Sequence, residues 1–423
     1  MSTITQLIRS AYVRPIRKCY IKRRNITTGV YETDWMRIDN WENKDRVINW
    51  GSVSLEINHQ PAEIDKFEVS NLSMVFSNNE GHFNADTFTN SIWYGYLNRK
   101  YTKLKITCGY MDTDNTEVGV VDIFEGVIDR VIVGENQQAR VTILSYQTIL
   151  KKYDIKDLGL ASAERTIENL MADIMNQTKI TTYIPYVAAT PNIANISIAN
   201  PSTLEGNYWD NIVYFATITN SIPLLIGSTF SFTSRTASAL SQWDFKGYGS
   251  DNQPDIYIIS YYDDEGADKV RLRFQENGGS TVSISTNATL LLKYLGDLSD
   301  GSEVEFVDMA NVKTANKQSI LDTLIAEWEN PRPVIEFDSK MFLNQLKPTD
   351  KVTVEVIQKL KYASAGRGFT WDSWTWDEPV GNIPLWDEET GAISIVSGRT
   401  WMVVKIIKNI NNWTSKIKIE EIV

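Results

Sequence analysis

Apolar and polar side chains alternate with a period of two through most of the segment 17–150, and short polar turns interrupt the alternation. In residues 51–57, Val53, Leu55 and Ile57 alternate with serine and glutamate. The same pattern recurs in residues 67–76, 104–108, 124–128 and 141–143. A period of two is typical of strands with one covered face. We therefore predict a small antiparallel β-barrel or β-sandwich here.

Two local features refine this prediction. Ser70 and Asn71 interrupt the alternation of 67–76, which indicates a bulge within one continuous strand. The letters NNEG at 78–81 combine residues that favour turns, and they predict the end of that strand.

The spacing of apolar residues changes to three and four in three later segments, which are 162–178, 207–220 and 317–329. This spacing predicts amphipathic helices. Alternation returns at 256–259 and 270–274, on either side of the turn letters DDEG at 263–266, and predicts a hairpin. Further strands are predicted at 351–356, 400–407 and 416–422.

The length of the chain, 423 residues, favours several domains over one core. The changes of period suggest four divisions: 1–155, an N-terminal β-barrel domain; 156–235, a helix-containing middle domain; 236–310, a β-rich lobe; and 311–423, a C-terminal domain with one helix and barrel-type strands. The expected fold class is mainly β, an α+β multidomain arrangement of antiparallel barrels or sandwiches with a few short helices.

The formal net charge of −11 disfavours general nucleic-acid binding, because affinity for phosphate comes from clustered Lys and Arg. The stretch 9–24 is the basic exception. It is either an arm that contacts phosphate or a first strand that docks on an acidic neighbour, and we favour docking. The candidate docking arm consists of Arg14, Arg17, Lys18, Arg23 and Arg24.

Enzymatic chemistry has little support in the sequence. The two histidines, His59 and His82, lie in no catalytic or metal-binding motif, and no Gly-rich phosphate loop follows a predicted strand. Cys19 and Cys108 are too few for a disulfide framework, and we predict that both are buried thiols. We therefore expect no enzyme activity, no cofactor, no metal site and no membrane-spanning segment.

Indole side chains gather in one turn-rich segment and are interleaved with aspartates. Such a loop either packs on its own domain or forms the apolar centre of a subunit contact. Stacking against sugar is a third alternative. The candidate subunit-contact residues are Trp371, Trp374, Trp376 and Trp386.

Several short motifs, spread over most of the chain, resemble bacteriophage tail proteins of the tail-tip or baseplate hub family. Residues 78–83 (NNEGHF), followed by Trp93 and Tyr94, are similar to a turn that precedes an aromatic segment in their first domain. Residues 124–129 (FEGVID) resemble a recurrent strand of that domain. Residues 346–352 (LKPTDKV) resemble the approach to a final strand, although Thr349 replaces the usual glycine.

The resemblance implies a structural virion protein, made in the host cytoplasm, with tube-type domains at residues 1–155 and near the C-terminus. It implies a homotrimeric ring that continues the tail tube at the tail tip. The expected partners are further copies of the chain, the tail tube or distal tail protein, fibre or spike proteins, the tape measure protein, and DNA passing transiently through an acidic lumen. The alternatives are a sixfold distal tail adaptor ring and, in another class, a carbohydrate-binding module for host recognition.

Overall fold

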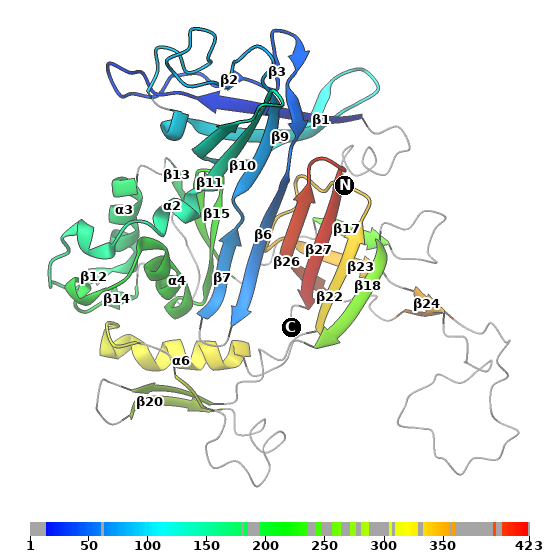
Figure 1. The fold of residues 1–423 in the computed structure, drawn as a ribbon. Helices are drawn as coiled ribbons and strands as arrows, with labels where there is room; N and C mark the ends of the chain where they lie inside the picture. Colours follow the sequence, from blue (N-terminus) through cyan, green and yellow to red (C-terminus); the bar gives the residue numbers. More distant parts are fainter. Residues whose placement is uncertain are drawn as a thin grey trace, which may run out of the picture.

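Strands dominate the computed structural model, and most neighbouring strands are antiparallel (Figure 1). The predicted fold class, mainly β with a few short helices, is confirmed. The structure describes residues 14–60, 63–97, 99–178, 182–184, 195–234, 242–246, 256–263, 271–275, 281–286, 304–306, 309–328, 333–355, 357–359, 392–394 and 400–421. No helix among them is long and apolar enough to cross a bilayer.

A seven-stranded sheet forms the N-terminal part of the molecule. Alternating burial explains its strands, as in β11, where Ala139, Val141 and Ile143 are buried between more exposed neighbours. In spatial order the strands are β2 (Met36–Arg37), β1 (Arg14–Lys22), β9 (Lys103–Met111), β10 (Glu117–Val133), β11 (Gln138–Ser145), β8 (Leu72–Ser77) and β5 (Val47–Asn49).

A second sheet brings together strands that are far apart in the sequence. Its strands are β17 (Trp243–Lys246), β23 (Lys351–Glu355), β26 (Thr400–Asn409), β27 (Thr414–Glu421), β22 (Pro333–Ser339) and β18 (Ile256–Asp263), with β6 (Ser52–Gln60) and β7 (Glu63–Val69) attached through β26. One edge of β26 pairs with β27, while the other is shared by β23 and β6. The first and last parts of the chain are thus joined by backbone hydrogen bonds.

A two-stranded ribbon connects the two sheets. The segment predicted as one bulged strand is two strands, because β7 ends at Val69 and β8 begins at Leu72. β8 pairs with β11 and β5 in the first sheet, whereas β7 pairs with β6 in the second. Gly51 bends the partner strand between β5 and β6, and a Cβ there would lie 2.6 Å from the Ser73 carbonyl oxygen.

The described strands close no barrel, so the barrel alternative of the sequence analysis is wrong for them. The physical reason is the ribbon: the second half of its first strand, β6, and the first half of its second strand, β7, pair in the second sheet, which keeps both sheets open. One hydrophobic core nevertheless runs across both sheets.

The three predicted helices exist. They are α3 (Ile167–Thr178), α4 (Tyr208–Ile218) and α6 (Thr314–Trp328). α3 starts later than predicted because Arg165 and Thr166 form β12, which pairs with β14 (Ser197–Ile198). α4 begins where Asn207 caps it, since the Asn207 Oδ1 accepts a hydrogen bond of 2.9 Å from the backbone N–H of Asp210.

The remaining elements are short and lie in several parts of the molecule (Figure 1). They are β3 (Asn40–Trp41), β4 (Lys44–Asp45), η1 (Arg99–Tyr101), α2 (Tyr146–Leu150), η2 (Ile155–Leu158), β13 (Thr182–Ile184), η3 (Pro201–Thr203), β15 (Ser221–Ile226), β16 (Thr229–Ser234), β19 (Arg271–Gln275), β20 (Thr281–Thr286), β21 (Val304–Phe306), β24 (Ile357–Lys359) and β25 (Ala392–Ser394). The predicted hairpin around 263–266 is wrong, because β18 pairs with β22 while β19 pairs with β20 and β21.

Polar side chains tie the two sheets together at a buried junction. Asn344, in the loop after β22, donates hydrogen bonds of 2.9 Å and 2.7 Å to the carbonyl oxygens of Cys108 and Gly119. The backbone carbonyl oxygen of Asn344 accepts a hydrogen bond of 2.7 Å from the Lys408 ammonium. The Tyr110 hydroxyl donates to the Phe342 carbonyl nearby.

Both cysteines are buried thiols, as the sequence predicted. Burial raises the pKa of Cys108 to about 12. Burial, and then the nearby Asp39 carboxylate, also raise the pKa of Cys19. Neither thiol is therefore a ready nucleophile.

Candidate functional site

The candidate docking arm forms strand β1 and the residues just after it, and the first of its basic side chains contact the β9–β10 hairpin. Arg14 donates to Asn115 at 2.8 Å and to the carbonyl of Asp112. The Lys18 ammonium lies 2.6 Å from the Glu117 carboxylate. Since these partners belong to the same chain, the two charges are already engaged in the monomer.

Arg17 contacts the second sheet instead. It donates a hydrogen bond of 2.8 Å to the carbonyl of Ile410, and its guanidinium lies 5.3 Å from the centroid of the Trp50 ring. It therefore helps to hold the sheets together.

Arg23 is held on several sides. It forms a two-pronged ion pair with Glu32, at 2.6 Å and 2.9 Å, and its guanidinium lies 3.7 Å from the centroid of the Tyr96 ring. Burial raises the pKa of Glu32, but the hydrogen bonds from Arg23 outweigh it and lower the pKa overall. Arg24 donates to the carbonyl of Gly29 at 2.7 Å. Docking of the arm on another subunit stays a prediction.

Lysines and aromatic rings share the outer face of β1 and β9, opposite the core. Lys105 lies 4.8 Å from the Trp35 ring centroid, and Lys22 lies 5.7 Å from the same centroid. Lys103 lies 5.0 Å from the Tyr31 ring centroid. These five residues are called the lysine–aromatic cluster below.

Two lysines of the lysine–aromatic cluster face each other directly. Lys22 of β1 is the cross-strand partner of Lys103 of β9. Burial lowers the pKa of Lys103, and the charge of Lys22 lowers it further, while Glu125 acts in the opposite direction. Like charges directly opposite one another destabilise a sheet. A negative group brought next to Lys22 and Lys103 by a partner would therefore offset the repulsion between the two lysines.

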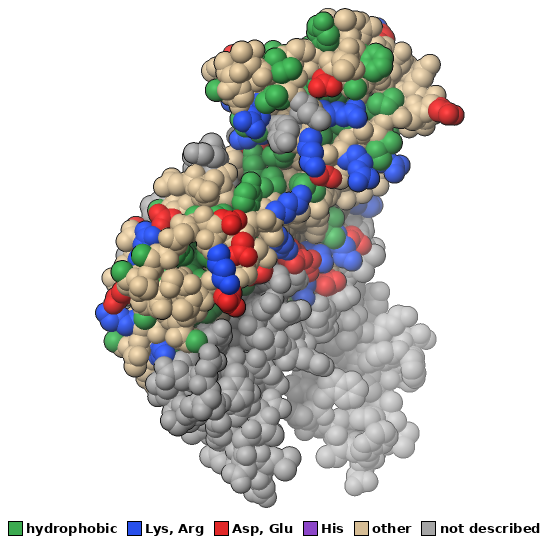
Figure 2. Space-filling model, turned by 60° about the vertical axis from the view of Figure 1, so that its left-hand side comes forward, with side chains coloured by type: hydrophobic (Ala, Val, Ile, Leu, Met, Phe, Trp, Pro, Cys, Tyr) green, Lys and Arg blue, Asp and Glu red, His purple; other side chains and the backbone are tan. Residues whose placement is uncertain are grey.

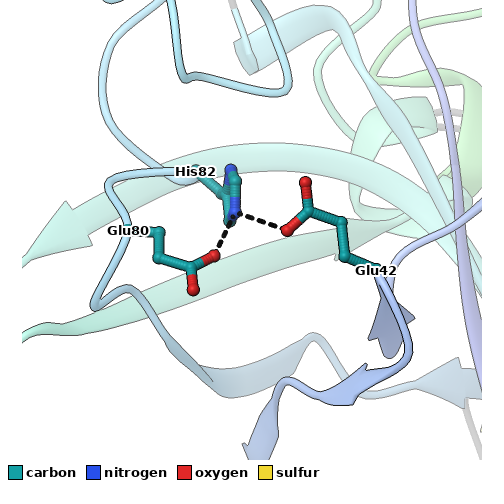
Figure 3. A group of neighbouring side chains, drawn as sticks. All are labelled: Glu42, Glu80 and His82. Atoms are coloured by element: carbon teal, nitrogen blue, oxygen red, sulfur yellow. Dashed lines mark hydrogen bonds and ion pairs between the residues drawn. The ribbon is translucent and has the colours of Figure 1, made fainter.

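A second charged group joins the β3–β4 hairpin to the predicted turn at 78–81 (Figure 3). The Nε2 atom of His82 lies 2.9 Å from the Glu80 carboxylate and 3.7 Å from that of Glu42. Its Nδ1 atom lies 3.0 Å from the Asn90 carbonyl oxygen, which can only accept, so Nδ1 carries a proton. This places two carboxylates and an imidazole nitrogen within reach of one cation.

Arg46 supplies that cation. Its Nη2 atom lies 2.7 Å from the Glu80 carboxylate, 3.4 Å from that of Glu42 and 3.5 Å from His82 Nε2. The Arg46 guanidinium thus occupies the position that a metal ion would take, and Lys44 also pairs with Glu80. The hydrogen bonds from Lys44, and then from Arg46, lower the pKa of Glu80 to about 2. The group is best described as a set of ion pairs that joins the β3–β4 hairpin to the turn at 78–81.

Replacing Arg46 by alanine tests this description. We expect Arg46→Ala to lower the free energy of unfolding by about 1–2 kcal/mol, because a nearly buried cation between half-exposed carboxylates is lost. Micromolar Zn²⁺ should raise the melting temperature of the variant, whose ligands are then open, and leave that of the natural chain unchanged. A melting temperature of the natural chain that falls with a chelator would instead identify a metal site.

The predicted subunit-contact residues Trp371, Trp374, Trp376 and Trp386 lie outside the described residues. The lysine–aromatic cluster was not among the predicted sites, although the alternation of Lys103 and Lys105 with Leu104 and Ile106 carries its signal in the sequence.

Comparisons with known proteins place the fold. The structure is similar to that of the tail protein from Neisseria meningitidis MC58, with a TM-score of 0.51 and 10% sequence identity over 96% of each chain. The chain has the fold of a tail protein. The prophage tail protein gp18 from Listeria monocytogenes EGD-e matches with a TM-score of 0.49 and 10% identity, over 95% of this chain and 94% of that one. The 43 kDa tail protein of prophage MuSo2 from Shewanella oneidensis matches with a TM-score of 0.47 and 7% identity, over 96% of each chain.

No protein-family model matches the chain, and no curated protein matches it. The likeness is thus one of fold, found at an identity too low to carry residue roles from one protein to another.

Proposed function

We propose that this protein is a structural component of a bacteriophage tail, and that it assembles with itself into a ring-shaped hub at the tail tip. The observation that carries the proposal is the shared fold with a tail protein, which extends over 96% of both chains and so includes both sheets and the ribbon between them. In this role the protein acts by assembly and catalyses no reaction.

Open sheet edges support an assembling role. Within the described residues, β1 pairs with β9 over its whole length. Its other edge pairs with β2 at Tyr20 and Ile21 and bonds to Ile38 and Asp39 at Cys19, so that Arg14–Lys18 have no strand partner on that side among the described residues. An unpaired edge is a template for pairing with another chain, and ring closure is one way to satisfy it. A hub of this kind would continue the tail tube and anchor fibre or spike proteins.

The number of copies in the assembly tests the proposal. Native mass spectrometry of the purified or virion-extracted protein should give three copies of the 48.1 kDa chain for a hub. Six copies would indicate a distal tail adaptor ring instead. A chain that remains monomeric at every accessible concentration, and that is absent from purified tails, would refute a structural role in the tail.

A further inference from the structure

We propose that the lysine–aromatic cluster is the docking site for residues 369–390 of a neighbouring copy of this chain. The inference rests on the proposed ring assembly and names the two surfaces that meet in it. The first surface is a described face of the N-terminal sheet. The second is a segment that lies outside the described residues, and its sequence is what bears on the proposal.

The cluster offers positive charge that the fold itself leaves only partly compensated. Lys22 and Lys103 are directly opposed across β1 and β9, and Lys105 lies two pairs further along, opposite Tyr20. Two carboxylates act on these lysines: Glu125 raises the pKa of Lys103 and is the cross-strand partner of Lys105, and Asp122 lies 3.4 Å from Lys105. Figure 2 shows Lys and Arg side chains gathered between the top of the molecule and its helical part, against a net charge of −11 for the whole chain.

The aromatic members make this more than a charged patch. Trp35 and Tyr31 lie beside the lysines, with ring faces 4.8–5.7 Å from the ammonium groups. Rings held in this way present flat apolar surface next to fixed cations, which suits a partner that brings both indoles and carboxylates. In protein interfaces aromatic side chains are enriched at the centre and charged side chains lie at the polar rim, and the cluster offers both kinds of contact.

Residues 369–390 have the complementary composition. Together with the four tryptophans already named, the segment contains six acidic residues and no Lys or Arg; the acidic residues are Asp372, Asp377, Glu378, Asp387, Glu388 and Glu389. Charge complementarity of this kind sets the choice of partner and the rate of association. No other stretch of similar length in the chain combines four indoles with so many carboxylates.

The arrangement of the fold favours contact between copies over contact within one chain. The elements that flank the segment, β24 and β25, pair with each other. Figure 1 places β24 at the right-hand edge of the molecule, with the second sheet between it and the N-terminal sheet that carries the cluster. A head-to-tail contact of two different surfaces is the kind that closes a ring when the rotation is right.

Disulfide trapping tests the contact, and the chain suits the method because both natural cysteines are buried. Chains carrying Lys105→Cys are mixed with chains carrying Trp376→Cys, assembled and oxidised. We expect a covalent dimer on non-reducing gels that disappears on reduction. Lys156→Cys, at an exposed lysine near the middle helices, is the matched control and should give no dimer with Trp376→Cys.

Charge reversal provides the second measurement. Lys22→Glu combined with Lys103→Glu should raise the dissociation constant of the assembly by about tenfold or more, because like charges would then face each other. Lys22→Gln combined with Lys103→Gln should have a smaller effect, and unchanged melting curves show that the variants fold. The docking proposal would be overturned if the disulfide formed within a single chain instead of between chains. It would also be overturned if neither pair of lysine substitutions changed the dissociation constant of the assembly. Absence of any assembly by the natural chain would instead refute the proposed hub.

Discussion

Replacing Asn344 by alanine is expected to lower the free energy of unfolding by about 2–4 kcal/mol, because it removes two hydrogen bonds that a buried side chain donates to backbone carbonyl groups. These are the carbonyls of Cys108 and Gly119, in β9 and β10, and Asn344 is itself buried in the loop after β22. The substitution removes a link between the sheets as well as a hydrogen bond. Chemical denaturation monitored by tryptophan fluorescence measures the effect.

Asn412→Ala is the matched control for this prediction. Asn412 is exposed in the turn between β26 and β27. Its replacement should change the free energy of unfolding by less than about 0.5 kcal/mol. If the two alanine variants unfold at the same denaturant concentration, Asn344 does not hold the sheets together as described.

Much of the secondary structure could be predicted because local patterns determine it. Strand β11 alternates between buried and exposed positions, and its sequence alternates in the same way. Helix α4 begins at its Asn207 cap, close to the predicted start. Turn chemistry also placed the bend at 78–81, where Gly81 has a φ of +77°. In each case the decisive information lies within a few residues.

Strand partners were harder to predict, since they depend on residues far away in the chain. The turn letters at 263–266 favour a hairpin, yet β18 pairs with β22, more than seventy positions along the sequence. Likewise, β6 pairs with both its neighbour β7 and the distant β26. A strand pattern states that a face is covered, but it does not state by which strand.

The turn at Thr349 is one place where the resemblance to tail hub proteins can be compared with the structure. Glycine is usual where this chain has Thr349, and Thr349 adopts a φ of +76°. The turn therefore keeps a backbone conformation that suits glycine, at a cost in strain for a β-branched side chain. The departure in sequence has not removed the turn.

Lys408 shows why a buried charge escaped the sequence analysis. Residues 400–407 were predicted to be a strand, and alternation along a regular strand places Lys405 and Lys408 on opposite faces. In the structure the face that carries Ile406 is buried, so Lys408 points inward while Lys405 pairs with Glu56 at the surface; a register shift between Val403 and Lys405 interrupts the alternation before them. A bulge of this kind has no clear sequence signal in the chain.

The buried Lys408 should make stability depend on pH in the alkaline range. Burial lowers its pKa to about 8, from 10.5 for a free lysine; the Asp350 carboxylate acts in the opposite direction. The folded chain therefore binds fewer protons than the unfolded chain between these two values, and the free energy of unfolding rises with pH across that window. Below the lower value the full penalty for burying the charge is present, about 3 kcal/mol at this shift.

Lys408→Met isolates this contribution, because methionine keeps most of the volume and removes the titrating group. We expect the free energy of unfolding of the variant, relative to that of the natural chain, to fall by about 3 kcal/mol between about pH 7 and about pH 10.5. The hydrogen bond to Asn344 that the variant also loses shifts this difference by a constant amount and does not change its dependence on pH. Other titrating groups are present in both proteins and cancel in the difference. Lys416→Met, on the exposed side of β27, should give a flat difference over the same range. Parallel profiles for Lys408→Met and the natural chain would mean that the Lys408 ammonium is solvated in the folded protein, and that the junction between the sheets is open to water.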